Sequence, residues 1–384
     1  MTANKISKTL EQIKQEANFI DLMSTNFADF SAKFPYAVIS DEIKGYFKNH
    51  VYLPDPKGLL TARKAIAQFY QTRGTTVDPE QIFVTASTSE SYQLLFQALT
   101  KPGDNILLPN PGYPLFEYLA RFKSLESRLY QLDFSKDWQI DLDSIISQLD
   151  NRSKILVLIS PNNPTGAVVS QEQLKAVSEI ALRNKLNIIA DEVFAEYLYG
   201  NSLPRITNIA KDLPVFTLNG ISKMLALPDL KLAWIAATGK NINPIVDQLE
   251  TINDVFLNAN YLSQTILPTL FKEMPNIQKP ILDNLRINHK SLKTIFSKAE
   301  FIKFNQPAGG IHCLLRIRKS LKNYQLSEED FVLKLLNDLH VNVHPGYFYD
   351  YQDQRAQYFH IVISLLQQTN LFKQALKRLA KFIG

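Results

Sequence analysis

A lysine stands just after an apolar segment in the middle of the chain, where its charge is costly. Lys223 follows the strand-like run 215–218, and Lys231 comes eight residues later. Burying an ammonium group without a partner is unfavourable, so such a lysine tends to have a lowered pKa or to serve as an amine nucleophile. A neutral lysine amine can form a Schiff base with an aldehyde. Lys223 is therefore a candidate for carrying an aldehyde cofactor.

Three further polar motifs stand at the ends of apolar segments. Ser87 and Thr88 follow residues 82–85 and precede a helical pattern, so they could seat a phosphate at a helix N-terminus or simply cap that helix. Asn163 lies in a turn-forming segment, where its amide could also bind a ligand oxygen. Asp191 ends an apolar run, and a carboxylate there could cap a helix or pair with a protonated ring nitrogen.

The elements that would position these motifs alternate between apolar runs and amphipathic segments. Continuously apolar runs predict strands covered on both faces, and the segments between them predict helices. This order predicts a mostly parallel sheet with helices on both faces, whose ligands bind at the carboxyl ends of the strands. The predicted strands are residues 82–85, 106–108, 155–160, 186–190, 215–218 and 232–236, and the predicted helices are 90–99, 115–122, 142–149 and 171–184.

The C-terminal third has a different pattern. A helical pattern over 275–297 is followed by strand-like segments at 312–317, 341–343 and 360–364 and by helical patterns at 328–339 and 370–382. We therefore predict a smaller α+β domain. A chain of 384 residues is also too long for one ordinary core. The predicted division is a large domain over 45–270 and a second unit made of an N-terminal arm, 1–44, with 271–384.

Composition and charge indicate a cytoplasmic protein that binds neither membrane nor nucleic acid. Hydrophobic residues make up 45% and charged residues 21% of the chain, as in ordinary globular proteins. The net charge of +5 comes from scattered side chains rather than from a basic block. Cys313 is the only cysteine, so no intrachain disulfide can form. The polar N-terminus lacks a signal core, and no apolar run approaches a membrane span in length. No metal site is predicted.

Taken together and in this order, the motifs resemble those of the aspartate-aminotransferase-like superfamily of pyridoxal-phosphate enzymes, fold type I. The resemblance runs from about Tyr52 to the C-terminus. It rests on Asn-Asn-Pro-Thr-Gly at 162–166, Ala-Asp-Glu-Val at 190–193, and Ser-Lys at 222–223 with Pro-x-Leu-Lys-x-x-Trp at 228–234. It implies an α/β fold with a large domain, built on a mostly parallel seven-stranded sheet flanked by helices, and a smaller α+β C-terminal domain.

The resemblance also implies pyridoxal 5'-phosphate as cofactor and a role for each motif residue. Lys223 would form the Schiff base and later move the proton, and Asp191 would keep the pyridine nitrogen protonated, so that the ring accepts electrons. Asn163 would bind the phenolic oxygen, and Tyr113 would stack on the ring. The phosphate would be held by Ser87, Thr88, Ser222 and Lys231. Tyr52 resembles a tyrosine that reaches the phosphate of the neighbouring subunit, which implies a homodimer.

The cofactor residues depart from the family pattern at three positions. Lys231 stands where arginine is usual, so it can neutralise a phosphate but lacks the bidentate fork. Gly220 stands where a phosphate-binding serine is common. Phe194 stands where a tyrosine usually donates to the phenolic oxygen, so that oxygen would depend more on Asn163; simple packing is the other interpretation of Phe194.

The substrate side departs further, because the late strand at 360–365 lacks the arginine that usually binds the substrate carboxylate. We take His360 as the leading substitute, with Arg316 and Arg355 as alternatives; each could equally be a structural or surface residue. His344 lies in a Pro-Gly loop that resembles one near the family's active site, where it could contact substrate or only fill the loop. Residues 24–27 replace the usual N-terminal substrate loop.

The predicted function is an aminotransferase that moves an amino group between an amino acid and a 2-oxo acid. A β-eliminating carbon–sulfur lyase on the same fold is the nearest alternative, because it needs the same lysine, aspartate and asparagine. A non-catalytic cofactor-binding regulator is a third possibility; such regulators usually carry a DNA-binding domain, for which we expect no room before Gly45. The motifs do not name the donor and the acceptor.

Overall fold

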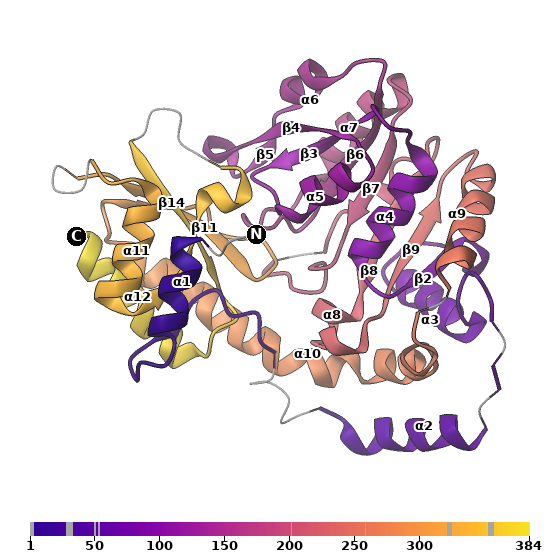
Figure 1. The fold of residues 1–384 in the computed structure, drawn as a ribbon, viewed down its shortest axis with the longest axis horizontal. Coiled ribbons are helices and arrows are strands. Elements are labelled where there is room, and N and C mark those ends of the chain that lie inside the picture. Colours follow the sequence, from indigo (N-terminus) through magenta and orange to yellow (C-terminus); the bar gives the residue numbers. More distant parts are fainter. Residues whose placement is uncertain are drawn as a thin grey trace.

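A sheet that has eight strands in the described part of the chain forms the centre of the larger part of the molecule (Figure 1). The computed structural model describes residues 4–27, 34–49, 51–52, 54–200, 202–257, 259–320, 325–351 and 357–384. In spatial order the strands are β2 (Ile82–Thr85), β9 (Ala233–Thr238), β8 (Val215–Gly220), β7 (Asn187–Asp191), β6 (Ser153–Ile159), β3 (Asn105–Asn110), β4 (Glu126–Asp133) and β5 (Gln139–Ile140).

The sheet is mostly parallel, as predicted. Pairs β3–β4, β3–β6, β6–β7 and β7–β8 run parallel, whereas β9 is antiparallel to both β2 and β8. Every strand predicted in this part is present, with bounds shifted by at most two residues. The structure adds β4, which the sequence patterns did not reveal, and β5, a two-residue strand antiparallel to β4 that makes one strand more than the expected seven.

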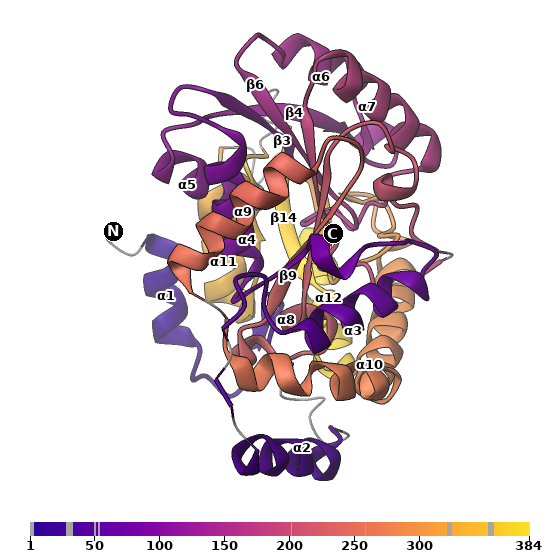
Figure 2. The same cartoon turned by 90° about the vertical axis from the view of Figure 1, so that its right-hand side faces the viewer.

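Helices cover both faces of this sheet. Ile106 and Leu108 pack in one apolar cluster with α4 (Thr88–Leu99), α5 (Leu115–Phe122) and α9 (Asn243–Phe256), and Figure 2 shows α9 beside α4. Leu107 points the other way, into a cluster with α6 (Leu142–Gln148) and α7 (Gln171–Arg183). This alternation is why the strands are apolar throughout. The predicted helices at these positions are confirmed.

A smaller antiparallel sheet lies beside the main one. Its strand order is β10 (Ile302–Lys303), β11 (His312–Arg318), β14 (Tyr358–Ser364) and β13 (His344–Pro345). This small sheet shares an apolar cluster with α11 (Glu328–Leu339), α12 (Thr369–Ile383) and α1 (Lys5–Ile13). The N-terminal segment joins this part, because β1 (Ile20–Asp21) pairs in parallel with β12 (Val341–Asn342).

One long helix connects the two parts. Helix α10 (Tyr261–Phe296) begins well before the predicted residue 275 and contains three prolines, and Figure 1 shows it beneath both parts. Its first half packs with α3 (Leu60–Gln71) and α2 (Tyr36–Lys48), and its second half packs in the cluster of the small sheet. The division at residues 44 and 270 stays a prediction. Within the described ranges, no helix is both long and apolar enough to cross a membrane.

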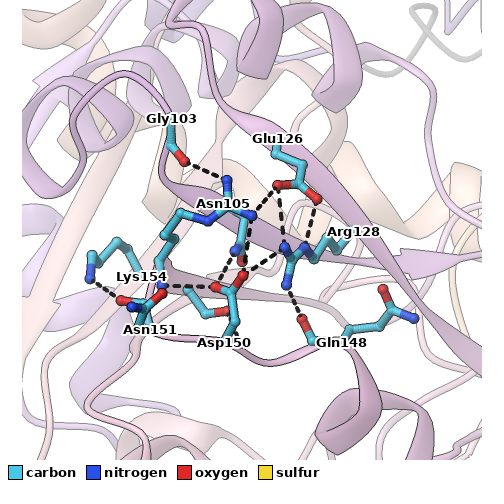
Figure 3. Close-up of polar contacts among 10 residues, drawn as sticks. Gly103, Asn105, Glu126, Arg128, Gln148, Asp150, Asn151 and Lys154 are labelled. Atoms are coloured by element: carbon cyan, nitrogen blue, oxygen red, sulfur yellow. Dashed lines mark hydrogen bonds and ion pairs between the residues drawn. The ribbon is translucent and has the colours of Figure 1, made fainter.

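An ion-pair network joins the amino ends of β3, β4 and β6 (Figure 3). Arg128 contacts the carboxylates of Glu126 and Asp150 at 2.8 Å each and donates to the backbone carbonyl of Gln148 at 2.7 Å. Asn105, the first residue of β3, donates to Asp150 at 2.8 Å. Charged groups at this end of the sheet therefore satisfy one another, far from the carboxyl ends where the sequence predicts the site.

Candidate active site

A cavity of about 460 Å³ opens at the carboxyl ends of the main-sheet strands. Most of the residues predicted from the sequence line it: Ser87, Thr88, Tyr113, Asn163, Asp191, Ser222, Lys223 and Lys231. We call Asn163, Asp191, Ser222 and Lys223 the main-sheet wall. His312, His344 and Tyr349, which come from the small sheet and the turn after it, form the small-sheet wall. The cavity thus lies between the two parts of the molecule.

Lys223 is held on a single helical turn, α8 (Ile221–Met224), directly after β8. The hydroxyl of Tyr197 donates to the Lys223 carbonyl at 2.5 Å, and Gln278 of α10 donates to the next carbonyl at 2.9 Å. These bonds anchor the backbone and leave the amine in the cavity. Burial lowers the pKa of Lys223, so a larger share of its amine is neutral and nucleophilic.

Asp191 ends β7 with a buried carboxylate. The Tyr92 hydroxyl donates to one carboxylate oxygen at 3.0 Å, and the Val193 backbone N–H donates to the other at 3.1 Å. Burial raises the pKa of Asp191 to about 6 in spite of these two bonds. The carboxylate lacks a cationic partner among the described residues, so a bound cation would stabilise its ionised form.

Asn163 presents an amide whose oxygen is buried and makes no hydrogen bond in the described part of the chain. The turn that holds it is clamped from the small-sheet side, because the backbone N–H groups of Ala308 and Gly309 donate to the Gly166 carbonyl at 2.9 and 3.0 Å. Gly166 has φ +70°, and a Cβ there would lie 2.5 Å from the Pro307 side chain. A rigid turn with an unsatisfied amide fits a ligand-binding role better than a turn alone.

The residues proposed for the phosphate gather around the N-terminus of α4. Ser87 caps that helix and accepts a hydrogen bond from the Glu90 N–H at 3.2 Å, while Thr88, Ser222 and Lys231 line the same cavity. Gly220 lies so close to β9 that a Cβ would come within 2.9 Å of both the Ala233 Cβ and the Leu232 carbonyl oxygen. Close packing therefore explains why a serine does not occur at position 220.

The three aromatic positions named from the sequence have different surroundings. Tyr113 lines the cavity and is 43% exposed, as expected for a ring that could stack on a planar ligand. Phe194 is buried, lines the cavity and meets the His312 ring edge-on at 6.0 Å. Tyr52 lies outside the cavity, is 62% exposed, and contacts the Tyr261 ring at 5.6 Å.

Two of the three predicted substrate residues, His360 and Arg316, are not brought to the cavity. His360 is only 1% exposed, its backbone N–H donates to Glu328 at 2.7 Å, and its ring stands edge-on to Tyr351. Arg316 is sandwiched between the rings of Phe134 and Tyr358, at 4.4 and 4.3 Å. Neither residue is part of the cavity lining. Arg355 lies outside the described residues.

The structure adds residues that sequence patterns missed. Tyr92 is one helical turn inside α4 and reads as an ordinary helix residue, and no sequence signal links it to Asp191. His312 begins the predicted strand at 312–317, and the strand pattern gives no sign that its ring lines the cavity. His344, for which the sequence left substrate contact and loop packing as alternatives, lines the cavity and lies 3.2 Å from the Tyr349 hydroxyl. The segment 24–27, expected to replace the N-terminal substrate loop, also lines the cavity through Thr25, as does the preceding Met23.

The main-sheet wall fits pyridoxal 5'-phosphate by its donor set. The unpartnered oxygen end of Asn163 marks an amide free to turn toward a ligand, and buried Asp191 suits a protonated ring nitrogen. Lys223 offers an amine to an aldehyde, and the N-terminus of α4 with Lys231 suits a phosphate. The residues present therefore match each polar group of that cofactor.

Comparisons with known proteins agree with this geometry. The chain is 29% identical over 389 residues to the glutamate–pyruvate aminotransferase AlaA of Haemophilus influenzae, covering 99% of this chain and 94% of that protein. The structure of an alanine aminotransferase from Pyrococcus furiosus superimposes with a TM-score of 0.88 at 25% identity, covering 98% and 95%. The S-alkyl-thiohydroximate lyase SUR1 of Arabidopsis thaliana is 30% identical over 304 residues, covering 75% and 64%.

A family model agrees with these individual likenesses and covers most of the chain. The model described as "Aminotransferase class I and II" matches residues 17–373, which include both walls of the cavity and the segments that hold them. The match confirms the predicted superfamily, the fold and the activity as a pyridoxal-phosphate-dependent aminotransferase. The chain belongs to the class I and II aminotransferases.

Proposed function

We propose that this aminotransferase binds its cofactor through Lys223 in the described cavity and transfers an amino group between alanine and a 2-oxo acid. The observation that carries the proposal is the meeting of Lys223, Asp191 and Asn163 on one cavity wall, where burial lowers the pKa of Lys223 and raises that of Asp191. Alanine is proposed because two of the matched proteins are named for alanine or for pyruvate, its 2-oxo acid.

The bound cofactor supplies an aldehyde for amines and a ring that takes up electrons. Lys223 holds that group covalently when no substrate is present, and its freed amine takes a proton from the substrate α-carbon and returns one later. Asp191 would pair in its ionised form with the protonated ring nitrogen, and Tyr92 holds the carboxylate in place. Asn163 orients the ring, and Tyr113 covers its face. The residues that bind the substrate carboxylate are not part of this assignment; His360, Arg316 and Arg355 stay predictions for that role.

Adding the amino donor alone tests the transfer. Because the first half-reaction leaves the amino group on the cofactor, alanine without any acceptor should change the absorption spectrum of the holoenzyme and release about one pyruvate per active site. A 2-oxo acid added afterwards should restore the original spectrum. A spectrum that no amino acid changes would contradict transfer by this cavity.

A carbon–sulfur lyase is the second candidate, and the likeness to SUR1 favours it specifically. Lyase chemistry would use the same main-sheet wall but would release pyruvate and ammonia from a cysteine conjugate continuously, with no acceptor present. Continuous pyruvate release from a cysteine conjugate, combined with no response to alanine, would favour the lyase over the transferase.

We also propose a homodimer in which Tyr52 reaches the phosphate of the neighbouring subunit. The end of α9 lies against the segment after Tyr52, because Asn253 donates to the Pro56 carbonyl at 2.6 Å. Exposed apolar side chains lie near these two segments in the sequence, and exposed apolar surface is typical of protein interfaces. The exposed side chains before Pro56 are Phe47, Val51 and Tyr52, and those after Asn253 are Val255, Phe256 and Leu257. The cytoplasmic location stays a prediction from composition.

A further inference from the structure

Two histidines of the small-sheet wall face the cavity without an assigned role. His312 is the first residue of β11 and His344 the first of β13, so the small sheet delivers both rings to the same cavity as Lys223. The two imidazoles and the Lys223 amine are near enough for their charges to interact. In the described part of the chain, neither ring nitrogen of His312 makes a hydrogen bond, and its Nδ1 is fully buried.

Both rings are uncharged near neutral pH. Burial, together with the nearby Lys223 and His344, lowers the pKa of His312 to about 3. Burial also lowers the pKa of His344, against a smaller opposing effect of Asp21. A neutral imidazole carries one N–H donor. The wall therefore offers hydrogen-bond donors without a permanent charge.

Tyr349 orients one of these donors. Its hydroxyl lies 3.2 Å from Nδ1 of His344, and burial raises the pKa of Tyr349, so the hydroxyl keeps its proton. When the hydroxyl donates to Nδ1, the imidazole proton is on Nε2. Nε2 then remains available as a donor to a molecule in the cavity.

A donor left unpaired in a buried place costs free energy, so a ligand that accepts a hydrogen bond here is favoured. The other candidates for an anion anchor are engaged elsewhere. His360 is packed behind the turn at Gly346, whose Cβ position lies 2.5 Å from the His360 Cβ, and Arg316 is sandwiched between two rings. Neither of those side chains lines the cavity, whereas both histidines of the small-sheet wall do.

We propose that the imidazoles of His312 and His344 bind the carboxylate of the substrate through uncharged hydrogen bonds. This inference rests on the proposed function, because a carboxylate is the group that an amino donor and a 2-oxo acceptor share. One wall then serves both halves of the reaction. The donors distinguish a carboxylate from a neutral amide of the same shape, because hydrogen bonds to charged acceptors are the stronger ones.

The test is binding of propionate, a carboxylate without an amino group, to the holoenzyme by titration calorimetry. Replacing His312→Phe keeps a ring of similar shape but removes the donor, and should weaken propionate binding roughly 10- to 100-fold. His312→Gln keeps an uncharged donor and should stay within about threefold of the wild type. Propionamide should bind weakly and equally to all three proteins. The KM for alanine should rise in His312→Phe while kcat changes little.

His289→Phe is the matched control, because that ring stacks on Tyr199 away from the cavity lining and should leave propionate binding unchanged. If His312→Phe fails to fold, His344→Phe and His344→Gln give the same comparison. Unchanged propionate binding in the phenylalanine variants, or equal losses in Phe and Gln variants, would overturn the assignment. An enzyme that transfers no amino group would refute the proposed function instead, and propionate binding would still decide the role of the histidines.

Discussion

Polar groups at the amino end of the main sheet are paired with one another, whereas key polar groups at its carboxyl end lack such partners in the described part of the chain. At the amino end, Asp150 receives hydrogen bonds from Arg128, Asn105 and the Arg152 backbone, so the network in Figure 3 satisfies itself. At the carboxyl end, Lys223 has no carboxylate partner among the described residues, and the amide oxygen of Asn163 is buried without a hydrogen bond. Charges that satisfy one another serve the fold, whereas groups left unsatisfied in a cavity await a ligand.

The same contrast appears in two carboxyl groups. Burial raises the pKa of Asp191 to about 6. Burial would also raise the pKa of Asp150, but the hydrogen bonds from Arg152, Arg128 and Asn105 outweigh it and hold that pKa well below its usual range. Asp150 therefore favours the folded state when ionised, whereas ionised Asp191 opposes it until a cationic ligand arrives. This fold therefore tolerates an unfavourable buried carboxylate at the place where the bound cofactor is expected to supply a positive charge.

The largest expected effect is a difference in turnover between variants of two lysines, one at each end of the sheet. Lys223→Ala should lower turnover by at least about 10⁴-fold, because it removes both the covalent link and the proton carrier. Lys154→Ala, at the amino end of β6, removes only a hydrogen bond to the Asn151 carbonyl and should leave turnover unchanged. Steady-state transfer from alanine measures both. Substantial turnover in Lys223→Ala would remove the central assignment.

A second expected effect concerns pH and stability in the cofactor-free protein. Between about pH 4 and 6 folded Asp191 keeps a proton that the unfolded chain has lost, so its contribution to stability is present at low pH and disappears as pH rises, by about 3 kcal/mol in total. Asp191→Asn should therefore be more stable than the wild type at pH 7 and similar to it at pH 4. Urea unfolding across this range measures the difference.

Asp150→Asn is the matched control, for which the expected change in folding stability at pH 7 has the opposite sign. Because the pKa of Asp150 is lowered in the folded state, its contribution is present near neutral pH and is lost as pH falls below the ordinary value for aspartate. The variant should therefore be less stable than the wild type at pH 7 and approach it in acid. Parallel stability profiles for the Asp191 and Asp150 variants would erase the contrast between the two ends of the sheet.

The smallest expected effect concerns cofactor affinity at the carboxyl end of the sheet, where the proposed neighbouring subunit contributes Tyr52. In the proposed homodimer, Tyr52→Phe would remove one hydrogen bond to the neighbouring phosphate and should raise the dissociation constant of the cofactor roughly tenfold. Tyr36→Phe changes an equally exposed tyrosine on α2 and should have no effect. Equilibrium dialysis of the cofactor, with molecular mass measured in solution, checks both. A monomeric protein, or equal effects of the two variants, would count against the shared site.

Much of the fold was predictable because local patterns of apolar residues indicate its strands and helices. Continuous apolar runs marked the central strands, since each is covered by helices on both faces. Strand β4 was missed because it lies near the sheet edge, and exposed polar residues interrupt its apolar pattern. The start of α10 was missed because Pro268 and Pro275 are typical of helix breaks or helix starts, whereas the helix continues through both.

The site divides in the same way. The residue types at positions 163, 191 and 223 could be recognised because each lies at or just after the carboxyl end of a strand and together they match the polar groups of one cofactor. The substrate residues could not be recognised by position alone. His360 occupies the expected strand but is packed against Glu328 and Tyr351, so register does not reveal whether a side chain reaches the cavity.

The sequence by itself determined the chemistry of the main-sheet wall: a lysine amine, a carboxylate and an amide, each at the end of a strand. Only the tertiary structure decided which distant side chains complete them. Tyr92 meets Asp191 across 99 positions of sequence, and His312 and His344 reach the cavity from a separate sheet. The physical reason is that hydrophobic periodicity records which face of an element is buried, whereas contacts between elements depend on how those faces pack.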